Sequence, residues 1–341
     1  MNYYRNIDKT KIQFDFICDN DSTDIPYEEI ESMGGRVFLI PPYQKVFDYQ
    51  KELRKLLKEN QYKIIHSHIN TLSVFPLYAA KKVGVPIRIA HSHSTTNKQE
   101  WKKNLLKQIL RPFSKLFANT YFACTKYAGD WLFGTKTNTY ILNNAIDLDK
   151  YKYNEEIRKK IREELHIKED ALVVGHIGRF VAQKNHNFLI DLFNEYQKHN
   201  NDSLLLLVGQ GPLKEEIESK VKNLNIENKV LFLGQRSDAN KLYQAFDIFL
   251  LPSIYEGLGM VLIEAQTSDL PCIASTEVPI IAKVTNNLEF IDLNNKEDWL
   301  NKLKEISINN RKDKTKEVKQ HGYDIKEECK KLEQKYLDLI K

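Results

Sequence analysis

Two glutamates and two glycines that could bind a ligand lie close together in the second half of the chain. Glu256 and Glu264 flank Gly257 and Gly259. Glycine lets a ligand approach the backbone closely, and the first amides of a helix, helped by its dipole, bind anions. Two carboxylates beside such an anion site predict a nucleotide-sugar site, with Glu264 near the ribose. The amides expected to face the phosphate are those of Leu258, Gly259, Met260 and Val261.

Arg179 and Lys184 are the candidate cations for that phosphate. They follow an apolar run that ends in Gly178, so they flank one strand-to-helix loop. Arginine binds a phosphate as a planar fork and lysine as a point charge, which together suit a diphosphate. Two solvated surface cations are the alternative interpretation. The tight turn that contains Gly209 and Gly211 follows the next apolar run and is assigned to the same donor site.

Two pairs of histidines end two other predicted strands. His66 and His68 end one strand, and His91 and His93 end the next. Their spacing occurs in metal sites, but no acidic residue or cysteine stands at ligand spacing nearby, so no metal is predicted. His66 and His91 fit capping or core histidines. His68 and His93 are the functional candidates, because an imidazole there can hydrogen-bond a sugar hydroxyl or polarise a leaving group.

These residues require strands and helices that bring them to one edge of a sheet. Short apolar runs with polar ends alternate with helical patterns, as in the strand 62–68 and the helix 72–83. This alternation predicts an α/β fold with parallel sheets. Such sheets bind ligands at the carboxyl ends of their strands. The strand 247–251, stopped by Pro252, places Glu256 at such an end.

The bulk composition narrows the class of protein. A length of 341 residues, with 42% apolar and 28% charged residues, predicts about two globular domains. No apolar run approaches a membrane span, and the charged opening argues against a signal peptide. The four cysteines are far apart and are expected to be reduced cytosolic thiols. Residues 1–145 carry 21 Lys and Arg against 13 Asp and Glu, and the remainder carries 30 against 33, which predicts different partners for the two halves.

A basic amphipathic helix is predicted within residues 98–117. Trp101, Leu105 and Ile109 share its apolar face, and Pro112 should kink or end it. Its basic residues recur every four positions: Lys103, Lys107, Arg111 and Lys115. Such a helix can lie on an anionic membrane surface, and an ordinary surface helix with a solvated face fits equally well. Nucleic acid is not an expected partner, because nothing resembles a base-reading module.

Taken together, these motifs resemble those of the retaining glycosyltransferases of family 4, with the bacterial capsule and exopolysaccharide enzymes as the nearest type. Glu256 and Glu264 match the E-x7-E motif of that family, and Gly178-Arg179 with Lys184 matches its G-R…K clamp. The segment 143–147 resembles the interdomain N-G-V-D turn, with alanine in place of the glycine. The segment 89–93 resembles the strand that carries the active-site histidine, which would be His93.

The resemblance implies a GT-B fold, in which two Rossmann-like domains face each other across a cleft. Residues 1–148 would form the acceptor-side domain, 149–323 the nucleotide-sugar-binding domain, and 324–341 a helix that crosses back to the first domain. Members of the family carry a glycine-rich loop after their first strand. This chain opens with a helical pattern followed by the strand 11–18, so we expect the N-terminal domain to be incomplete, without that first strand and loop.

The resemblance also implies a mechanism that needs no metal or other cofactor. Arg179 and Lys184 would neutralise the leaving diphosphate of a UDP-linked or similar donor. Glu264 would hold the ribose, Glu256 would contact the sugar near its C3 and C4 hydroxyls, and His93 would lie at the reaction centre. The leaving phosphate would accept the proton of the acceptor, with retention at the anomeric carbon. His68 and Asn143 are assigned to the acceptor or sugar side.

The expected reaction transfers a hexosyl or N-acetylhexosaminyl group to a saccharide on a polyprenyl diphosphate, in capsule or exopolysaccharide synthesis. A lipid-linked acceptor suits a basic first domain and a membrane-facing helix. The expected location is the cytoplasm, peripheral on the inner face of the plasma membrane.

Three alternatives compete with this interpretation. A nucleotide-sugar epimerase or hydrolase of the same fold should carry several acid and base groups for proton abstraction, whereas this chain offers mainly Glu256 and His93. A non-catalytic or inactive protein that binds nucleotide sugar is favoured by the expected loss of the first strand. A metal-dependent transferase would use Asp19-Asn20-Asp21, which has the pattern of a polar loop.

Overall fold

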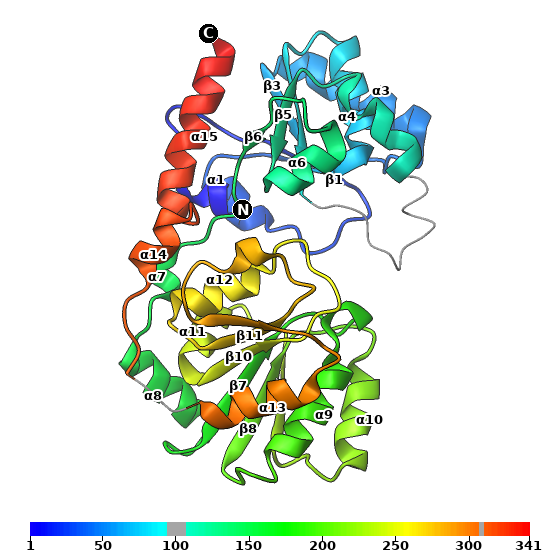
Figure 1. The fold of residues 1–341 in the computed structure, drawn as a ribbon. Helices are drawn as coiled ribbons and strands as arrows, with labels where there is room; N and C mark the ends of the chain where they lie inside the picture. The colour runs from blue at the N-terminus through cyan, green and yellow to red at the C-terminus, as the bar shows by residue number, and fades with distance from the viewer. Residues whose placement is uncertain (94–106, 307–309) are drawn as a thin grey trace. The chain divides into compact units, whose positions relative to one another are not determined.

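The chain folds into two compact units, each with its own parallel β-structure and core (Figure 1). The structure is a computed structural model that describes residues 1–93, 107–306 and 310–341. Unit 1 comprises Met1–Ala145 and Ile325–Lys341, and unit 2 comprises Ile146–Asp324. The chain therefore passes between the units after Ala145 and after Asp324, where the sequence places the boundaries after residues 148 and 323.

Unit 2 is a doubly wound parallel sheet with the order β12-β11-β10-β7-β8-β9. Its strands are short apolar runs, and a strand that is covered on both faces is expected to be apolar throughout. The strands are β7 (Leu172–Ile177), β8 (Ser203–Val208), β9 (Val230–Gly234), β10 (Ile248–Leu251), β11 (Cys272–Ser275) and β12 (Leu288–Ile291).

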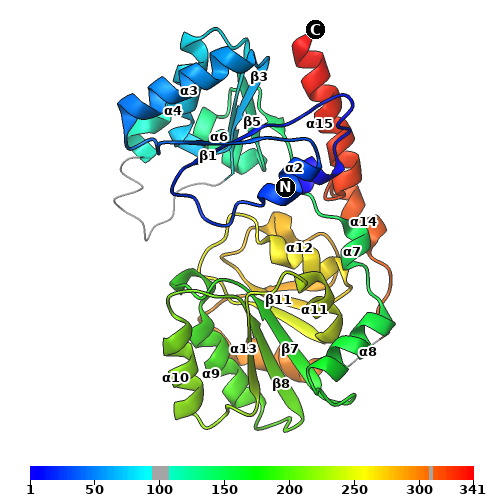
Figure 2. The same cartoon turned by 180° about the vertical axis from the view of Figure 1, so that it is seen from behind.

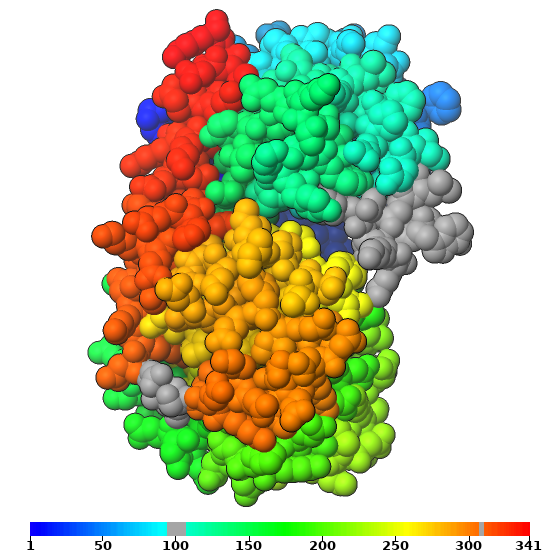
Figure 3. All heavy atoms as spheres, in the orientation of Figure 1, coloured from blue at the N-terminus to red at the C-terminus, as the bar shows by residue number. Residues whose placement is uncertain are grey.

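Helices cover both faces of this sheet (Figure 2). One core packs α8, α11 and α12 against alternate strand residues such as Val173 and Phe249, and the other packs α9, α10 and α13 against residues such as Val174 and Leu250. In the space-filling view of Figure 3, α13 (orange) forms part of the outer surface of unit 2. The helices are α7 (Leu148–Tyr151), α8 (Glu155–Glu164), α9 (His186–Tyr196), α10 (Lys214–Asn223), α11 (Ala239–Ala245), α12 (Met260–Thr267), α13 (Lys296–Glu305) and α14 (Thr315–Gln320).

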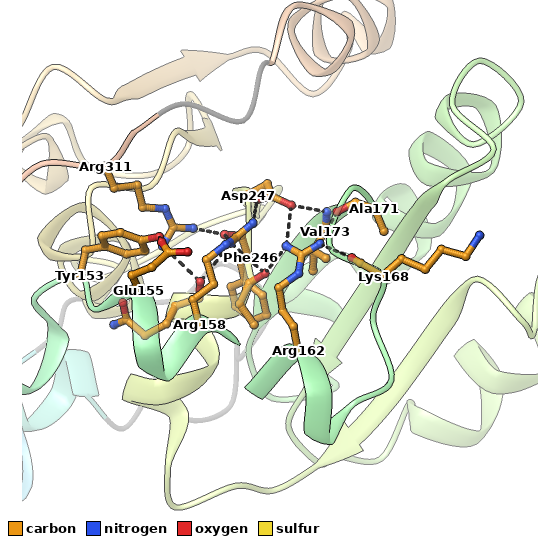
Figure 4. A network of polar contacts seen from close by, with 12 residues as sticks. Tyr153, Glu155, Arg158, Arg162, Lys168, Ala171, Val173, Phe246, Asp247 and Arg311 are labelled. Carbon is orange, nitrogen blue, oxygen red and sulfur yellow. Dashed lines mark hydrogen bonds and ion pairs between the residues drawn. The ribbon is translucent and has the colours of Figure 1, made fainter. Parts of the chain in front are cut away.

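A buried polar network stands at the amino-terminal edge of the unit 2 sheet (Figure 4). The carboxylate of Asp247 accepts hydrogen bonds from the backbone amide of Val173 at 2.7 Å, from Arg158 at 2.6 Å and from Arg162 at 3.2 Å. Arg158 and Arg311 also donate to backbone carbonyls at the end of α11, where the helix dipole is negative. The network therefore ties the start of β10 to the start of β7.

Unit 1 contains two separate parallel sheets. A four-stranded sheet has the order β3-β4-β5-β6, and β1 pairs only with β2. The predicted strand 11–18 is paired only from Phe16, because Lys11 lies in a turn with Asp8, and the strand runs on through Asp19. The predicted polar loop is therefore a turn that begins at Asn20, with Asp19 as the last residue of β1. The strands are β1 (Phe16–Asp19), β2 (Val37–Ile40), β3 (Ile64–Ser67), β4 (Ile87–Ser92), β5 (Thr120–Ala123) and β6 (Tyr140–Ile141).

The C-terminal helix belongs to unit 1 and covers one face of the four-stranded sheet. Leu332 and Tyr336 of this helix pack against Ile89 and Phe122, whereas α3 and α4 pack on the other face. The helices of unit 1 are α1 (Asn2–Asn6), α2 (Tyr27–Ser32), α3 (Val46–Asn60), α4 (Val74–Lys82), α6 (Lys126–Phe133) and α15 (Ile325–Ile340).

Residues 98–106 of the predicted basic helix lie outside the described residues. The described part ends in a short 3-10 helix, Arg111–Lys115, with Pro112 in its first turn. Across the described residues, no helix combines the length and the apolar character needed to cross a membrane. The four cysteines are free thiols.

Candidate active site

The predicted donor residues of unit 2 gather at the carboxyl ends of β7 and β10. These two strands are neighbours in the sheet. The strand order continues from β7 to β8 and β9 on one side, and from β10 to β11 and β12 on the other. This reversal is the topological switch point, where open α/β sheets bind ligands. The loop after β7 carries Arg179 and Lys184, and the loop after β10 carries Glu256.

The turn after β8 packs directly on the loop after β7. The backbone amide of Phe180 donates to the carbonyl of Gln210 at 3.0 Å. A β-carbon on Gly209 would lie 2.1 Å from the carbonyl oxygen of Gly178, and one on Gly211 would lie 2.4 Å from that of Phe180. Neither position therefore has room for a side chain. The two predicted glycines of this turn therefore let it pack closely on the loop after β7 (residues 178–185), the predicted phosphate loop.

The two predicted cations have different surroundings. Arg179 is exposed, and its guanidinium makes no hydrogen bond or ion pair with the residues that the structure describes. Lys184 closes a 3-10 turn just before α9, and its Nζ lies 2.6 Å from Oε1 of Glu256. The side chains of Lys184 and Glu256 are only 15% and 7% exposed. Arg179 is thus available to an anion from solvent, whereas Lys184 is already attached to a carboxylate.

Glu256 is held by three side chains. Besides Lys184, the hydroxyl of Ser253 donates to Oε1 at 2.7 Å, and the amide of Gln183 donates to Oε2 at 3.3 Å. Gln183 also donates to the carbonyl of Tyr255 at 3.0 Å, so it ties the loop after β7 to the loop after β10. Because hydrogen bonds to a buried carboxylate fix its position and stabilise its charge, Glu256 is presented in one orientation.

Gly257 and Gly259 differ in what they do. Gly259 has φ +80° and immediately precedes α12, so it supplies the left-handed turn that opens the helix. Gly257 is exposed, and a β-carbon there would meet nothing within 4 Å. The first amides of a helix have no intrahelical acceptor. The role of the amides from Leu258 to Val261 as a phosphate site stays a prediction.

Glu264 lies on α12 with a partner that sequence patterns do not reveal. The hydroxyl of Tyr243 donates to Oε2 of Glu264 at 2.7 Å. Burial raises the pKa of Glu264, and hydrogen bonds from Tyr243 and Tyr151 oppose that rise. The contact to ribose stays a prediction, made by a carboxylate that Tyr243 orients.

The predicted histidines of unit 1 lie together on one face of β3 and β4. Nδ1 of His68 lies 2.9 Å from Nε2 of His93, and Nε2 of His66 lies 3.0 Å from Nδ1 of His91. Burial lowers the pKa of His93, which favours the neutral imidazole. Asn143, which follows β6, accepts a hydrogen bond through its carbonyl from the hydroxyl of Tyr3.

Three supporting residues were not predicted from the sequence: Gln183, Ser253 and Tyr243. Gln183 and Ser253 each lie within three positions of a predicted residue, so proximity to Lys184 and Glu256 was the one available signal. Tyr243 carries no such signal, because a fully buried tyrosine on an amphipathic helix has the pattern of an ordinary core residue.

Comparison with known proteins shows the family to which the chain belongs. A sequence profile described as Glycosyltransferase Family 4 matches residues 1–150, and one described as Glycosyl transferases group 1 matches residues 157–324. EpsF of Bacillus subtilis (strain 168), whose own assignment as a glycosyltransferase is provisional, is 37% identical over 287 residues, covering 82% of this chain and 75% of EpsF. The chain belongs to the glycosyltransferase family that these two profiles describe. This glycosyltransferase is also 25% identical over 334 residues to the UDP-Gal:alpha-D-GlcNAc-diphosphoundecaprenol alpha-1,3-galactosyltransferase of Escherichia coli, covering 89% of the chain and 84% of that enzyme.

Solved structures confirm the GT-B fold predicted for the glycosyltransferase. HepE of Anabaena in complex with UDP superimposes with a TM-score of 0.70 at 19% identity, over 95% of this chain and 88% of that one. Sucrose-phosphate synthase of Thermosynechococcus elongatus superimposes with a TM-score of 0.75 at 17% identity, over 96% and 89% of the two chains. The family profile matches from residue 1, and the comparisons give no support to the predicted loss of a first strand and loop.

Proposed function

We propose that this glycosyltransferase transfers a hexosyl or N-acetylhexosaminyl group from a UDP-linked donor to a saccharide on a polyprenyl diphosphate, with retention at the anomeric carbon. The observation that carries the proposal is the contact between Lys184 and Glu256 at the switch point of the unit 2 sheet. It joins a cation suited to a phosphate to a carboxylate suited to sugar hydroxyls. Exposed Arg179 on the same loop adds a second cation.

In the proposed reaction, the bond between the anomeric carbon and the diphosphate oxygen breaks as the acceptor hydroxyl attacks from the same face. Negative charge grows on the diphosphate, where Arg179 and Lys184 stabilise it. The leaving phosphate takes the proton of the acceptor hydroxyl. These two cations do the work that a divalent metal does in other transferases, so the proposal includes no metal in the transfer step.

Glu256 and Glu264 would bind the donor on either side of the phosphate. Glu256 would accept hydrogen bonds from sugar hydroxyls while Ser253 and Gln183 hold its carboxylate. Glu264 would accept from the ribose, oriented by Tyr243. His93, with His68 and Asn143, is proposed for the sugar or acceptor side, where a neutral imidazole can hydrogen-bond a hydroxyl.

The acceptor and donor classes draw support from the names of relatives. The Escherichia coli relative is named for UDP-Gal and a diphosphoundecaprenol-linked acceptor, and HepE was solved with UDP. We extend both classes to this chain as part of the proposal, together with a role in exopolysaccharide or capsule synthesis and a cytoplasmic location.

Attachment to the inner face of the plasma membrane is the last part of the proposal. Ile109, Phe113 and Leu116 are 56%, 48% and 54% exposed and recur three to four residues apart, with Arg111 and Lys115 between them. Apolar and basic residues in this pattern suit an anionic lipid surface. A Phe113→Ser, Lys115→Glu double variant should sediment less with anionic vesicles than the wild type does. Equal sedimentation would exclude this surface.

The central test combines binding and transfer. UDP is titrated into the full chain by calorimetry, and UDP-sugars are then assayed with a synthetic polyprenyl diphosphate saccharide in EDTA. We expect one UDP site and transfer in EDTA, with NMR of the product showing the donor's anomeric configuration. UDP binding without transfer to any lipid-linked saccharide would refute the acceptor class. Transfer that stops in EDTA and returns with Mg²⁺ would refute the metal-free mechanism.

A further inference from the structure

Four imidazoles form one block on a single face of the unit 1 sheet. His66 and His68 alternate along β3 and its end, and His91 and His93 alternate along β4 and its end. Residues two apart on a strand point to the same face. The two strands are parallel neighbours with Ser67 opposite Ala90, so the next residue pair in that register is His68 and His91.

Within this block the rings are paired edge to edge and the pairs are stacked. The edge-to-edge contacts are those between His66 and His91 at 3.0 Å and between His68 and His93 at 2.9 Å. The rings of His66 and His68 stack with centroids 4.2 Å apart, and those of His91 and His93 stack at 4.0 Å. One nitrogen from each of His66, His68 and His91 lies within 4.8 Å of the other two. Three strongly ligating atoms thus converge on one small volume.

One nitrogen in the block has no partner. Nε2 of His91 is buried without a hydrogen bond among the described residues, and the residue is 2% exposed. A buried polar atom without a partner carries a desolvation penalty of about 1–3 kcal/mol. Hydrogen bonds between neutral imidazoles therefore leave Nε2 of His91 unsatisfied, and only an electrophile that accepts the lone pair of this atom would remove the penalty.

The block also has the outer contact that metal-ligating histidines use. Nδ1 of His66 lies 2.5 Å from the hydroxyl of Tyr336 on α15. A metal-bound histidine usually donates its second N–H to such an oxygen, which fixes the tautomer and frees the other nitrogen as ligand. Here that leaves Nε2 of His66, the atom that faces His91, to bind the ion.

We propose that His66, His68 and His91 bind one divalent transition-metal ion of the Zn²⁺ class. Imidazole is a preferred ligand of zinc, copper and nickel. Zinc–nitrogen bonds of 2.0–2.1 Å in a tetrahedron place the nitrogens roughly 3.3 Å apart, so the paired nitrogens must separate slightly and the stacked rings must tilt toward the ion. The site shares His68 with the proposed sugar or acceptor side, so metal binding is measured separately from sugar transfer. It would tie the ends of β3 and β4 to α15 through Tyr336.

The test uses the full chain without a histidine tag, stripped with EDTA and dialysed. Zn²⁺ is titrated against a chromophoric chelator, and Co²⁺ binding is followed by its visible absorption. We expect one equivalent of Zn²⁺ and a Co²⁺ spectrum typical of tetrahedral nitrogen ligands. We also expect affinity to fall at least tenfold in His68→Gln and in His91→Gln. The double variant His199→Gln, His321→Gln removes two exposed histidines of unit 2 and should bind as the wild type does.

His68 is exposed, so His68→Gln should fold even if the buried His91→Gln does not. Circular dichroism and the thermal midpoint of each variant establish folding before metal is added. Absence of stoichiometric binding to the wild type would overturn the proposal. So would binding that His68→Gln leaves unchanged, because the ligands would then lie elsewhere.

Discussion

Lys184 and Glu256 stand 72 positions apart in the chain, yet Nζ and Oε1 of these residues lie 2.6 Å apart in a site with little access to water. A cation proposed for the phosphate and a carboxylate proposed for the sugar therefore form one unit. Removing one member of a buried ion pair leaves the other charge uncompensated, at a cost of about 3–5 kcal/mol. Substitutions here must preserve shape if their effect on turnover is to be separated from their effect on folding.

Glu256→Gln is the first such substitution. The amide oxygen can still accept from Ser253 and Lys184, but the negative charge is lost. Turnover should fall by about 100-fold or more, the loss typical of a removed transition-state contact. The affinity for UDP should be retained or increased, because Lys184 no longer shares its charge.

Transfer rates and UDP calorimetry, with the thermal midpoint as a check on folding, measure these effects. Glu297→Gln on α13 removes an exposed carboxylate and serves as the matched control. Near-normal turnover of Glu256→Gln would contradict the assigned role.

Arg179→Ala tests the free cation of the phosphate loop. The side chain is exposed and makes no hydrogen bond or ion pair with the described residues, so its loss should change the free energy of unfolding by no more than about 0.5 kcal/mol. A charge-assisted hydrogen bond contributes about 1.5–3 kcal/mol, so UDP affinity should fall by roughly tenfold to 100-fold. Calorimetry with UDP checks the result, and Lys222→Ala, an exposed lysine on α10, should bind UDP normally. Unchanged UDP affinity in Arg179→Ala would remove this residue from the donor site.

Gly209→Ala and Gly257→Ala form a contrasting pair. A β-carbon at Gly209 would lie 2.1 Å from the carbonyl oxygen of Gly178, in a backbone with φ +143° that side chains rarely adopt. This variant should lose about 3 kcal/mol or more of stability, or distort the phosphate loop. Gly257→Ala has open space and should keep its stability while weakening donor binding, if the donor fills that space. Urea unfolding and UDP titration distinguish the two, and equal stability losses would contradict the packing assignment.

Asp247→Ala should destabilise unit 2 without entering the chemistry. It leaves the guanidiniums of Arg158 and Arg162 buried without a carboxylate, and the loss should be about 3–5 kcal/mol. Asp247→Asn keeps one accepting oxygen but turns an NH2 group toward a donor, so it should lose less stability than Asp247→Ala. Urea unfolding measures both variants. A loss below about 1 kcal/mol in Asp247→Ala would show that the carbonyls of α11 suffice for the arginines.

Stability should fall as the pH is lowered from 7 toward 4. Burial lowers the pKa of His186 to about 4, and it lowers those of His66, His91, His93 and His176 as well. An unfolded histidine titrates near pH 6.5, so below that pH the unfolded chain binds more protons than the folded one. Glu264 and Asp19 act in the opposite sense, because their raised pKa values favour the folded state at low pH, but they are two groups against five histidines.

Urea unfolding at pH 7.5 and at pH 5 measures this dependence. His186→Leu should reduce it, because both ring nitrogens of His186 are buried without a partner and the folded protein keeps the ring neutral. A free energy of unfolding that is equal at the two pH values would contradict the prediction.

Local patterns in the sequence determined the α/β class and most of the candidate residues. Apolar runs with polar ends placed Arg179, Lys184 and Glu256 after strands, because every parallel strand presents its carboxyl end to the same edge. The i, i+2 spacing likewise put both members of each histidine pair on one face of a strand. These conclusions depend only on periodicity and on the stereochemistry of glycine and proline.

Only the tertiary structure decided which of these residues touch. The contact of Lys184 with Glu256 depends on β7 and β10 being neighbours, and the block of four imidazoles depends on the register of β3 against β4. The orientation of Glu264 by Tyr243 depends on how α11 packs on α12. Pairings over long sequence distances are selected by burial of the whole core and not by the residues that meet. For that reason no local sequence pattern predicts these pairings.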